Sequence, residues 1–349
     1  MINWLVLLIS TAVFLLGAEV ILRIAGYRPW QPKVYADRPS IHMADPLLGW
    51  TLKPGEFLLP PYAPSGSEIH YTFLGNGLRK SHPGQTAVGD GRRVLLFVGG
   101  SYTQGWAISD RETFPWKLQE KRPDVEVLNY AVGGYGTYQA LLKLESVLPE
   151  LKRPGMVIYG FIEHHESRNV ASALWLETLS RFSRKEIDLP FVTRDGGGRL
   201  VRHPPEHYPV WPLREHSALV ALLQKSVVRG EAARREQMKR DVTERLLQEM
   251  DALSRRYGND FMVVILEATD AVRRHYLRFL RRNHIRVADC AFPLTRKTRV
   301  PGEGHPNAIQ NSKWADCIDE ALNKIQVQRA REQSPSGPGE ASQRPRPAG

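Results

Sequence analysis

The stretch Val94-Leu95-Leu96-Phe97-Val98-Gly99-Gly100-Ser101 decides the fold expected for this chain. An apolar run of strand length ends abruptly in two glycines and a serine, and a helical pattern begins soon afterwards at Thr113. A run without polar alternation is typical of a parallel strand that is buried on both faces. Because open α/β sheets place their sites at the carboxyl ends of the strands, Ser101 is expected to present its hydroxyl there. Gly-Gly-Ser also occurs in inert turns, so this interpretation needs a partner elsewhere in the chain.

That partner is the segment Gly302-Glu303-Gly304-His305-Pro306 near the other end of the chain. His305 is suited to remove a proton from a serine hydroxyl, because the unperturbed pKa of histidine is near 6.5. Glu303 can accept a hydrogen bond from the other ring nitrogen and stabilise the imidazolium. Since the two residues are only two positions apart, one loop must carry both. Ser101, His305 and Glu303 are therefore the candidate catalytic residues.

Short apolar runs alternate with helical patterns from residue 93 onward. Strands are expected at 93–98, 125–132, 156–162, 261–266 and 285–288, and helices at 113–121, 137–151, 271–283 and 308–331. Strands that alternate with helices predict right-handed crossovers and a parallel sheet covered on both faces. The fold class expected is α/β.

The other segments divide the chain around this core. Residues 27–92 are rich in Pro, Gly and Tyr and are predicted to form an irregular leader, with a short strand at 69–73. An insertion at about 168–258, with a loop-like section at 187–213 and a long charged helix at 231–256, is expected to cover the site as a lid. The tail from 334 to 349 has the composition of a disordered segment.

The N-terminal segment has the composition of a membrane-spanning helix. The stretch from Trp4 to Leu22 is almost wholly apolar, and about nineteen helical residues span roughly 28 Å, close to the thickness of the hydrocarbon core. No Lys or Arg precedes it, which favours a retained anchor at 1–26 over a cleavable signal peptide. The basic residues that follow would keep the next domain cytoplasmic by the positive-inside rule: Arg23, Arg28, Lys33 and Arg38.

Composition argues against several other classes of protein. The net charge of +11 invites a nucleic-acid partner, but much of the basic excess lies in helices that mix Arg with Glu, and no nucleic-acid partner is expected. No metal or other cofactor is expected either, because His164 and His165 are adjacent and would point to opposite sides of a strand end. Cys290 and Cys317 exclude a disulfide framework and leave either one bridge or two unrelated thiols.

Together, residues 93–325 resemble the SGNH (GDSL-like) hydrolase superfamily, in a membrane-anchored bacterial type. Val98-Gly99-Gly100-Ser101 is similar to the block that carries the nucleophile, although the family often has Asp where this chain has Gly100. The segment 129–137 is similar to the second block, whose glycine, Gly134 by register, donates its N–H to the oxyanion. Glu303 to Asn307 is similar to the last block, where the family acid is normally Asp. The resemblance implies a flavodoxin-like, three-layer α/β/α fold with a doubly wound sheet of about five parallel strands.

The third block departs from the family pattern. The family has a Gly-x-Asn-Asp-like segment there, whose Asn completes the oxyanion hole, whereas this chain runs from Gly160 into Glu163-His164-His165-Glu166. His164 falls near the Asn position, and an imidazole N–H can donate to an oxyanion. The resemblance therefore implies oxyanion donors at Ser101, Gly134 and His164.

The function that these patterns imply is that of a membrane-anchored serine esterase or O-acyltransferase. It would act on acyl esters of an envelope carbohydrate or lipid through a Ser-His-Glu triad, with water or a sugar hydroxyl as the acceptor. The family resemblance suggests an extracytoplasmic catalytic domain, against the charge pattern, so the orientation stays open. The alternative is a non-catalytic SGNH-fold module for binding or assembly in envelope polysaccharide metabolism.

Overall fold

Five parallel strands form the central sheet of the computed structural model, which describes residues 2–33, 38–86, 91–182 and 187–333. The strands are β5 (Arg93–Gly99), β6 (Val125–Asn129), β7 (Met156–Ile162), β10 (Asp260–Glu267) and β11 (Arg286–Asp289). Their spatial order is β11-β10-β7-β5-β6, and every pairing between neighbours is parallel. In chain order this is the 2-1-3-4-5 arrangement of flavodoxin-like sheets. The predicted fold class is confirmed.

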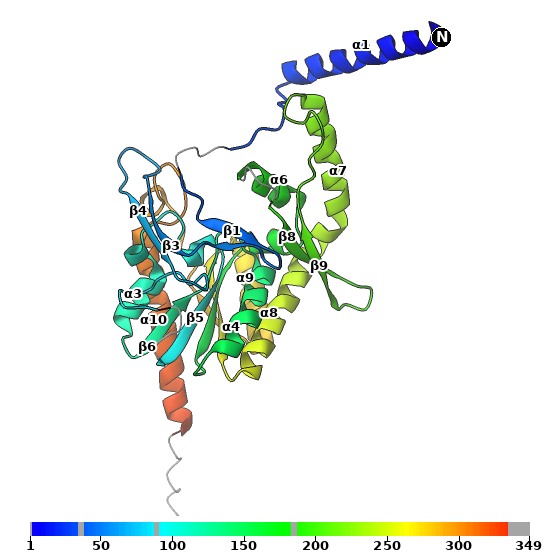
Figure 1. Ribbon diagram of the computed structural model, residues 1–349. Coiled ribbons are helices and arrows are strands. Elements are labelled where there is room, and N and C mark those ends of the chain that lie inside the picture. The colour runs from blue at the N-terminus through cyan, green and yellow to red at the C-terminus, as the bar shows by residue number, and fades with distance from the viewer. Residues whose placement is uncertain (1, 34–37, 87–90, 183–186, 334–349) are drawn as a thin grey trace, which may run out of the picture.

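Helices cover both faces of this sheet, which gives three layers (Figure 1). One face packs against α4 (Thr137–Val147), α8 (Lys239–Arg256) and α9 (Asp270–Arg282), and the other against α3 (Phe114–Lys121) and α10 (Ala308–Gln333). Alternate residues of β5 serve the two cores: Leu96 and Val98 face the first, and Leu95 and Phe97 face the second. Because both sides of the strand are covered, the run from Val94 to Val98 is apolar without alternation. The described residues also contain three short 3-10 turns in the connections between these elements: η1 (Asp110–Glu112), η2 (Leu148–Glu150) and η3 (Arg296–Thr298).

The leader is more regular than its composition predicts. It contains two antiparallel pairs, β1 (His42–Asp45) with β2 (Gly49–Leu52) and β3 (Gly55–Leu59) with β4 (Ile69–Phe73). The strand expected at 69–73 is β4, but the expectation of an otherwise irregular leader is wrong. The turn between β1 and β2 is closed by the Asp45 carboxylate, which accepts the N–H groups of Leu47 and Leu48. Strands of four or five residues are too short for their alternation to stand out from a Pro- and Gly-rich background.

The insertion after β7 is also organised differently from the expected lid. It contains α5 (His165–Asn169), α6 (Ala173–Phe182), a hairpin of β8 (Leu189–Arg194) and β9 (Leu200–Glu206), and α7 (Ala218–Gln237), which meets α8 at Met238. The charged helix expected at 231–256 is therefore two helices, and the section at 187–213 is not simply a loop. Val242, Leu246 and Met250 bury one stripe of α8 against the sheet. Because of this stripe, α8 is the crossover helix between β7 and β10 and does not belong to a lid.

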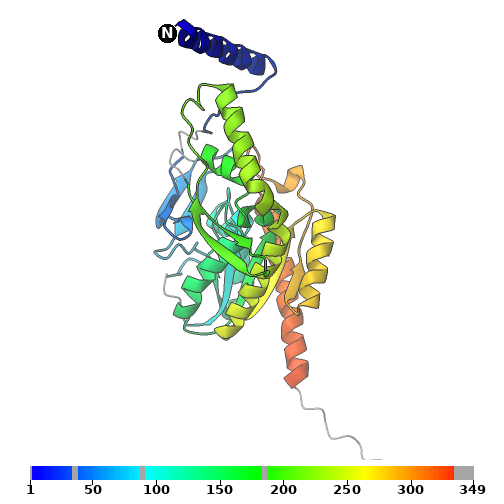
Figure 2. The same ribbon diagram turned by 90° about the vertical axis from the view of Figure 1, so that its right-hand side faces the viewer.

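The N-terminal helix α1 (Ile2–Ile24) projects from the body at the end opposite to the end of α10 (Figures 1 and 2). Among the described residues it is the helix that is long and apolar enough to cross a membrane. Its single acidic residue, Glu19, accepts hydrogen bonds from the Ser217 hydroxyl and from the N–H groups of Ala218 and Leu219. These groups belong to the N-cap and first turn of α7, where backbone donors have no partner within the helix. Glu19 thus attaches α1 to α7. The tail at 334–349, expected to be disordered, lies outside the described residues.

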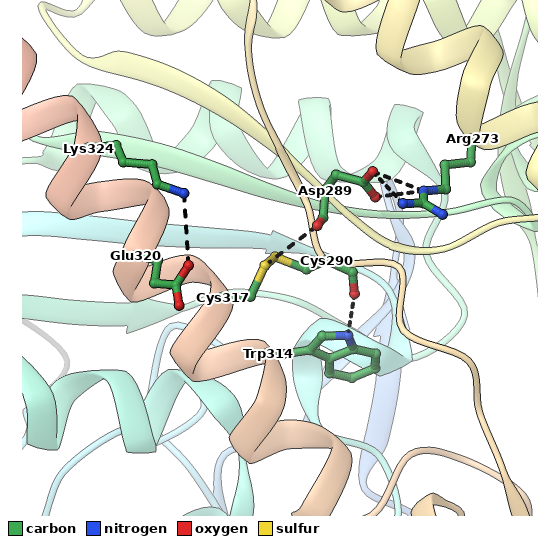
Figure 3. Close-up of a disulfide and its surroundings, with 7 residues drawn as sticks. All are labelled: Arg273, Asp289, Cys290, Trp314, Cys317, Glu320 and Lys324. Atoms are coloured by element: carbon green, nitrogen blue, oxygen red, sulfur yellow. Dashed lines mark hydrogen bonds and ion pairs between the residues drawn. A yellow bond between two sulfur atoms is a disulfide. The ribbon is translucent and has the colours of Figure 1, made fainter.

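A disulfide joins Cys290, which follows β11, to Cys317 on α10 (Figure 3). Of the two alternatives left open by the sequence, the structure has the bridge. The indole N–H of Trp314, one turn before Cys317, donates to the Cys290 carbonyl at 3.0 Å and supports the same junction. Both contacts hold α10 against the edge of the sheet near β11.

Replacing both Cys290 and Cys317 with serine is expected to lower the free energy of unfolding by about 3–4 kcal/mol. The bridge closes a loop of sequence separation 27, and its loss restores that entropy to the unfolded chain. Guanidinium denaturation of the full chain in detergent measures the change, with wild type under dithiothreitol as the matched control. A loss below about 1 kcal/mol in both samples would contradict a stabilising bridge.

Candidate active site

The candidate nucleophile lies in a glycine turn at the carboxyl end of β5. Gly99 has φ of 151°, Gly100 follows, and Ser101 begins the short helix α2 (Ser101–Gln104). A Cβ atom on Gly99 would lie 2.6 Å from Thr103 Oγ1, and one on Gly100 would lie 2.7 Å from His165 Nε2. Larger residues at either position would therefore displace the turn. Ser101 itself is 5% exposed.

Ser101, His305 and Glu303 form one hydrogen-bonded chain. His305 Nε2 lies 2.9 Å from Ser101 Oγ, and His305 Nδ1 lies 2.7 Å from Glu303 Oε1. Glu303 also accepts the backbone N–H of His305 at 2.7 Å and the indole N–H of Trp106 at 3.0 Å. The three residues that the sequence analysis selected are thus in direct contact, across a sequence separation of 204 between Ser101 and His305. Their order and geometry match those that a serine, its base and the orienting acid require.

A narrow loop after η3 explains why Glu303 and His305 share one side. Val300 N–H donates to the His305 carbonyl at 2.7 Å, which folds the segment back on itself. Gly302 has φ of 78°, and a Cβ atom there would lie 2.4 Å from the carbonyl oxygen of Tyr62 in the leader. Only glycine combines this left-handed backbone with so close an approach. The leader therefore packs against the loop that carries the acid and the base.

Two aromatic rings hold the imidazole of His305. Tyr102 lies edge-on to it with ring centres 5.5 Å apart, and the Trp106 ring lies at 6.3 Å. Burial raises the pKa of Tyr102 to about 12, so this phenol stays neutral beside the imidazole. The sequence analysis did not identify Tyr102 or Trp106, because an aromatic residue in a turn is more often a packing residue than part of a site. Only the fold brings Trp106 to Glu303.

The electrostatics favour an ionised Glu303. Burial raises the pKa of this carboxyl, but the hydrogen bonds from the side chain and backbone of His305, together with that from Trp106, outweigh it. The net result is a pKa below the ordinary value of 4.5. A carboxylate that accepts from Nδ1–H leaves Nε2 unprotonated and directed at Ser101 Oγ. This is the tautomer that can remove the serine proton.

Replacing Glu303 with glutamine is expected to lower kcat for ester cleavage by roughly 10²–10⁴-fold. The amide keeps the shape of the side chain, but its NH₂ can donate to Nδ1 and favour the wrong tautomer of His305. Steady-state kinetics at pH 7 tests this expectation. Glu320→Gln, at an exposed position of α10, is the matched control and should be neutral; equal rates for Glu303→Gln and wild type would contradict the role of the acid.

The predicted oxyanion donors Ser101 and Gly134 lie in neighbouring turns. Gly134 has φ of 88°, and a Cβ atom on it would lie 2.9 Å from the Trp50 ring and 3.4 Å from the Trp175 ring. Trp50 also donates its indole N–H to the Gly133 carbonyl at 2.9 Å, which fixes this turn. Within the described parts of the chain, the backbone N–H groups of Ser101 and Gly134 have no protein acceptor. Both donors are therefore available to a substrate oxygen.

His164 does not join this group. It is exposed at the start of α5, and no hydrogen bond links it to Ser101, Gly134 or His305 in the described structure. Its neighbour His165 is fully buried instead, with Nδ1 2.6 Å from the Tyr159 hydroxyl and Nε2 directed at the Gly100 turn. His164 is the N-cap of α5 and His165 is its first residue, so the two side chains point in different directions around a helical turn, and it is His165 that lies beside the Gly100 turn. Burial lowers the pKa of His165 well below its ordinary value, so this imidazole is neutral.

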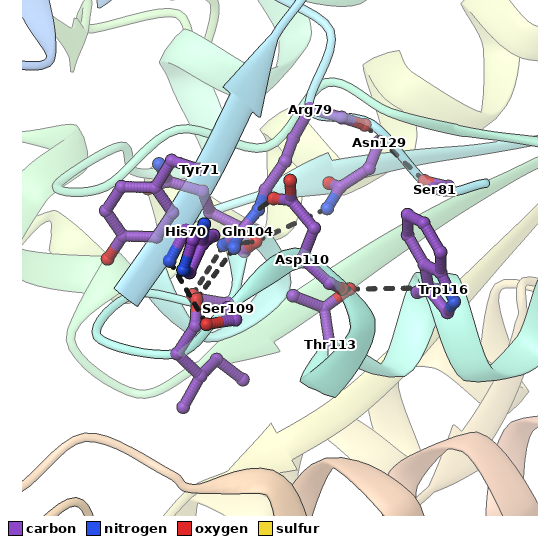
Figure 4. A network of polar contacts seen from close by, with 12 residues as sticks. His70, Tyr71, Arg79, Ser81, Gln104, Ser109, Asp110, Thr113, Trp116 and Asn129 are labelled. Atoms are coloured by element: carbon purple, nitrogen blue, oxygen red, sulfur yellow. Dashed lines mark hydrogen bonds and ion pairs between the residues drawn. The ribbon is translucent and has the colours of Figure 1, made fainter. Parts of the chain in front are cut away.

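Arg79 of the leader contacts the segment that follows Ser101, and Figure 4 shows its side chain beside Asp110 and Gln104. Its guanidinium is fully buried and forms an ion pair with Asp110 at 2.9 Å. The same group donates to the carbonyls of Gln104, Gly105 and Ile108, at 2.8, 2.5 and 2.7 Å. Gln104 ends α2, which Ser101 begins, and Gly105 is its C-cap, so Arg79 fixes the segment that carries the nucleophile. The sequence indicated a leader around Arg79 but not this contact.

Comparisons with known proteins give distant structural neighbours only. No protein-family model and no curated protein matches the chain. Among solved structures, the chain is similar to a member of the lipolytic protein G-D-S-L family from Veillonella parvula DSM 2008, at 10% identity and a TM-score of 0.39, covering 65% of this chain and 97% of that one. It is similar to the esterase EstA from Pseudoalteromonas sp., inhibited by monoethylphosphonate, at 11% identity and a TM-score of 0.37, covering 66% and 99%. It is also similar to AlinE4, an SGNH-hydrolase family esterase, at 13% identity and a TM-score of 0.36, covering 68% and 97%. These structural neighbours are esterases and lipolytic hydrolases of the GDSL/SGNH type, and likenesses at this level do not assign an activity to the chain.

Proposed function

We propose that this chain is a serine esterase or O-acyltransferase of the SGNH type, which cleaves acyl esters through Ser101, His305 and Glu303. The single observation that carries the proposal is the continuous hydrogen-bonded chain from Ser101 Oγ through His305 to the Glu303 carboxylate, with contacts of 2.9 and 2.7 Å. A serine hydroxyl is a poor nucleophile until a base removes its proton, and this chain supplies the base and its orienting acid.

The reaction would proceed in two halves. Ser101 Oγ attacks the ester carbonyl as His305 Nε2 takes its proton, and Glu303 stabilises the imidazolium. The backbone N–H groups of Ser101 and Gly134 stabilise the oxyanion, and one such donor is worth roughly 3–4 kcal/mol. His305 then returns the proton to the leaving alcohol, which departs and leaves an acyl-serine. Water or an acceptor hydroxyl, deprotonated by His305, attacks this ester and releases Ser101; the first gives an esterase and the second an acyltransferase.

The proposed location is the extracytoplasmic face of a membrane, with α1 as a single-pass anchor. The disulfide between Cys290 and Cys317 favours an oxidising compartment, because cytosolic thiols are kept reduced. The basic residues after α1 favour the opposite orientation, but one of them, Arg23, is used structurally: it pairs with Glu19 at 2.6 Å and donates to the His216 carbonyl. An acylated carbohydrate or lipid of the cell envelope is the substrate that suits this location.

The alternative function is a non-catalytic binding or assembly module with the same fold. The observation that favours it is the exposed position of His164. The SGNH family has a third oxyanion donor, and His164 is not positioned by any hydrogen bond in the described structure to replace it. The contact between Glu303 and His305 favours the enzyme, because a binding module has no need for an oriented base.

Ester turnover by the full chain in detergent micelles tests the proposal. We expect hydrolysis of p-nitrophenyl acetate that is lost after treatment with diethyl p-nitrophenyl phosphate, which reacts with activated serines. Addition of sugar acceptors separates transfer from hydrolysis, because acetylated sugar then accumulates in place of acetate. A folded wild-type protein that neither cleaves the ester nor reacts with the phosphate would support the non-catalytic module.

A further inference from the structure

Arg168 places a buried positive charge beside the nucleophile turn. Its side chain comes from α5 and the residue is only 8% exposed. Nη1 donates to the Tyr135 carbonyl at 2.9 Å and would lie 3.0 Å from a Cβ atom on Gly100. Because Gly100 directly precedes Ser101, the guanidinium adjoins the turn that carries the serine.

This charge has no carboxylate partner in the described parts of the chain. Its neighbours are the Tyr135 carbonyl, the neutral His165 and the ring of Trp175, which lies 4.5 Å from the guanidinium carbon. Burial lowers the pKa of Arg168 to about 10, so it remains charged at neutral pH. Arg79, which is fully buried, has the Asp110 carboxylate as its counter-ion. An unpaired buried charge is costly, which suggests that the partner of Arg168 comes from outside the chain.

Unsatisfied donors gather at the same place. Arg168 Nε and Trp175 Nε1 are both shielded from solvent and have no hydrogen-bond partner among the described residues. Arg168 Nη2 also has no partner there, but it is not one of the shielded atoms, so a ligand can approach it. The Trp175 ring reaches the turn at Gly134, within 3.4 Å of where a Cβ atom would lie. Buried donors without acceptors are rare in folded proteins and call for a ligand or water.

We propose that Arg168 binds a carboxylate carried by the ester substrate through Nη2, beside the ring of Trp175. The inference rests on the function proposed above and narrows it to anionic esters. A carboxylate oxygen matches Nη2, because Nη1 already donates to the Tyr135 carbonyl and Nε is shielded from solvent. An acidic side chain at position 100 would be a counter-ion for Arg168, but this chain has glycine there. The competing interpretation is that Arg168 is an oxyanion donor, in which case it would increase the cleavage rate of neutral and anionic esters alike.

The test compares three esters with the full chain in detergent micelles. The first, p-nitrophenyl acetate, carries no carboxylate. The second, the mono-p-nitrophenyl ester of succinate, carries one on the acyl group, and the third, 3-acetoxybenzoate, carries one on the leaving group. We expect wild type to favour one anionic ester over the neutral one by about 10-fold or more in kcat/KM, as one charged hydrogen bond predicts. Which anionic ester is favoured tells on which side of the ester bond the carboxylate lies.

Substitutions of Arg168 separate recognition from catalysis. Arg168→Met should abolish the preference, so that kcat/KM falls about 10-fold more for the favoured anionic ester than for the neutral ester, and Arg168→Lys should restore part of the preference. The exposed Arg234→Met is the matched control for general electrostatics and should keep it. Equal loss on neutral and anionic esters in Arg168→Met, or no preference in wild type, would overturn the proposal.

A binding measurement keeps the inference testable if the protein proves not to be an esterase. Ser101→Ala, which cannot turn over, is titrated calorimetrically with monomethyl succinate and with dimethyl succinate. We expect the monoester to bind about 10-fold more tightly, and the difference to vanish in Ser101→Ala/Arg168→Met. Equal binding of the two compounds would overturn the anion site, whereas tighter binding without turnover in wild type would overturn only the proposed catalysis.

Discussion

Ser101→Ala, His305→Ala and the double variant are expected to lower kcat for ester cleavage by the same large factor, about 10⁶. The reason is that the two side chains act as one unit: His305 Nε2 lies 2.9 Å from Ser101 Oγ and has no proton to take once that oxygen is gone. Without His305, the hydroxyl stays a poor nucleophile. Removing the second partner therefore costs little more than removing the first. The residual rate reports binding and the backbone donors alone.

Single-turnover kinetics on p-nitrophenyl acetate measures the three factors in the full chain. Ser226→Ala, the same substitution on the exposed face of α7, is the matched control and should keep the wild-type rate. Factors that multiply in the double variant would show that Ser101 and His305 act independently. A His305→Ala variant within 10-fold of wild type would contradict its role as the base.

Arg79→Met is expected to lower the free energy of unfolding by about 3–5 kcal/mol. The substitution removes the counter-ion of Asp110 and the donor to three carbonyls while the buried acceptors stay in place. Buried acceptors that lose their donor keep the full cost of desolvation. Because two of these carbonyls, those of Gln104 and Gly105, follow the serine in α2 and its C-cap, ester cleavage should fall as well.

Guanidinium denaturation of wild type and variant measures this loss. Arg199→Met is the matched control, since Arg199 pairs with Asp195 at 86% side-chain exposure and exposed pairs contribute about 1 kcal/mol or less. Adding Asp110→Asn to Arg79→Met should recover part of the stability, because it removes the uncompensated charge. Equal stability of Arg79→Met and Arg199→Met would contradict a central role for this network.

The sheet could be predicted from the sequence because its strands are buried on both faces. The buried residues of β5, β7 and β10 form apolar runs without alternation, and the helices of the chain bury stripes such as Val272, Tyr276 and Leu280 of α9. The helix α8 was taken for a solvated part of a lid because its buried stripe is surrounded by charged residues. The hairpins of the leader and of β8–β9 were missed because short strands with Pro and Gly lack a visible alternation.

The candidate site could be predicted only for residues that lie close together in the sequence or directly follow a recognisable strand. Glu303 and His305 share one loop, and Ser101 follows one strand directly, so their types and positions were informative. His164 and His165 follow β7 in a helical turn, and which of the two side chains faces the serine turn depends on where β7 ends and α5 begins, a boundary that the sequence does not mark. Arg79, Arg168 and Trp175 come from three separate elements, and their approach to the serine turn depends on tertiary packing that no local pattern records.

The central claim is that Ser101 is an activated nucleophile, and labelling with a fluorophosphonate followed by peptide mass spectrometry tests it most directly. The account predicts one covalent adduct on the peptide containing Ser101 of the full chain, slowed in Glu303→Gln and absent in Ser101→Ala and His305→Ala. No adduct on a folded wild-type protein, or an adduct on another serine that persists in Ser101→Ala, would contradict it.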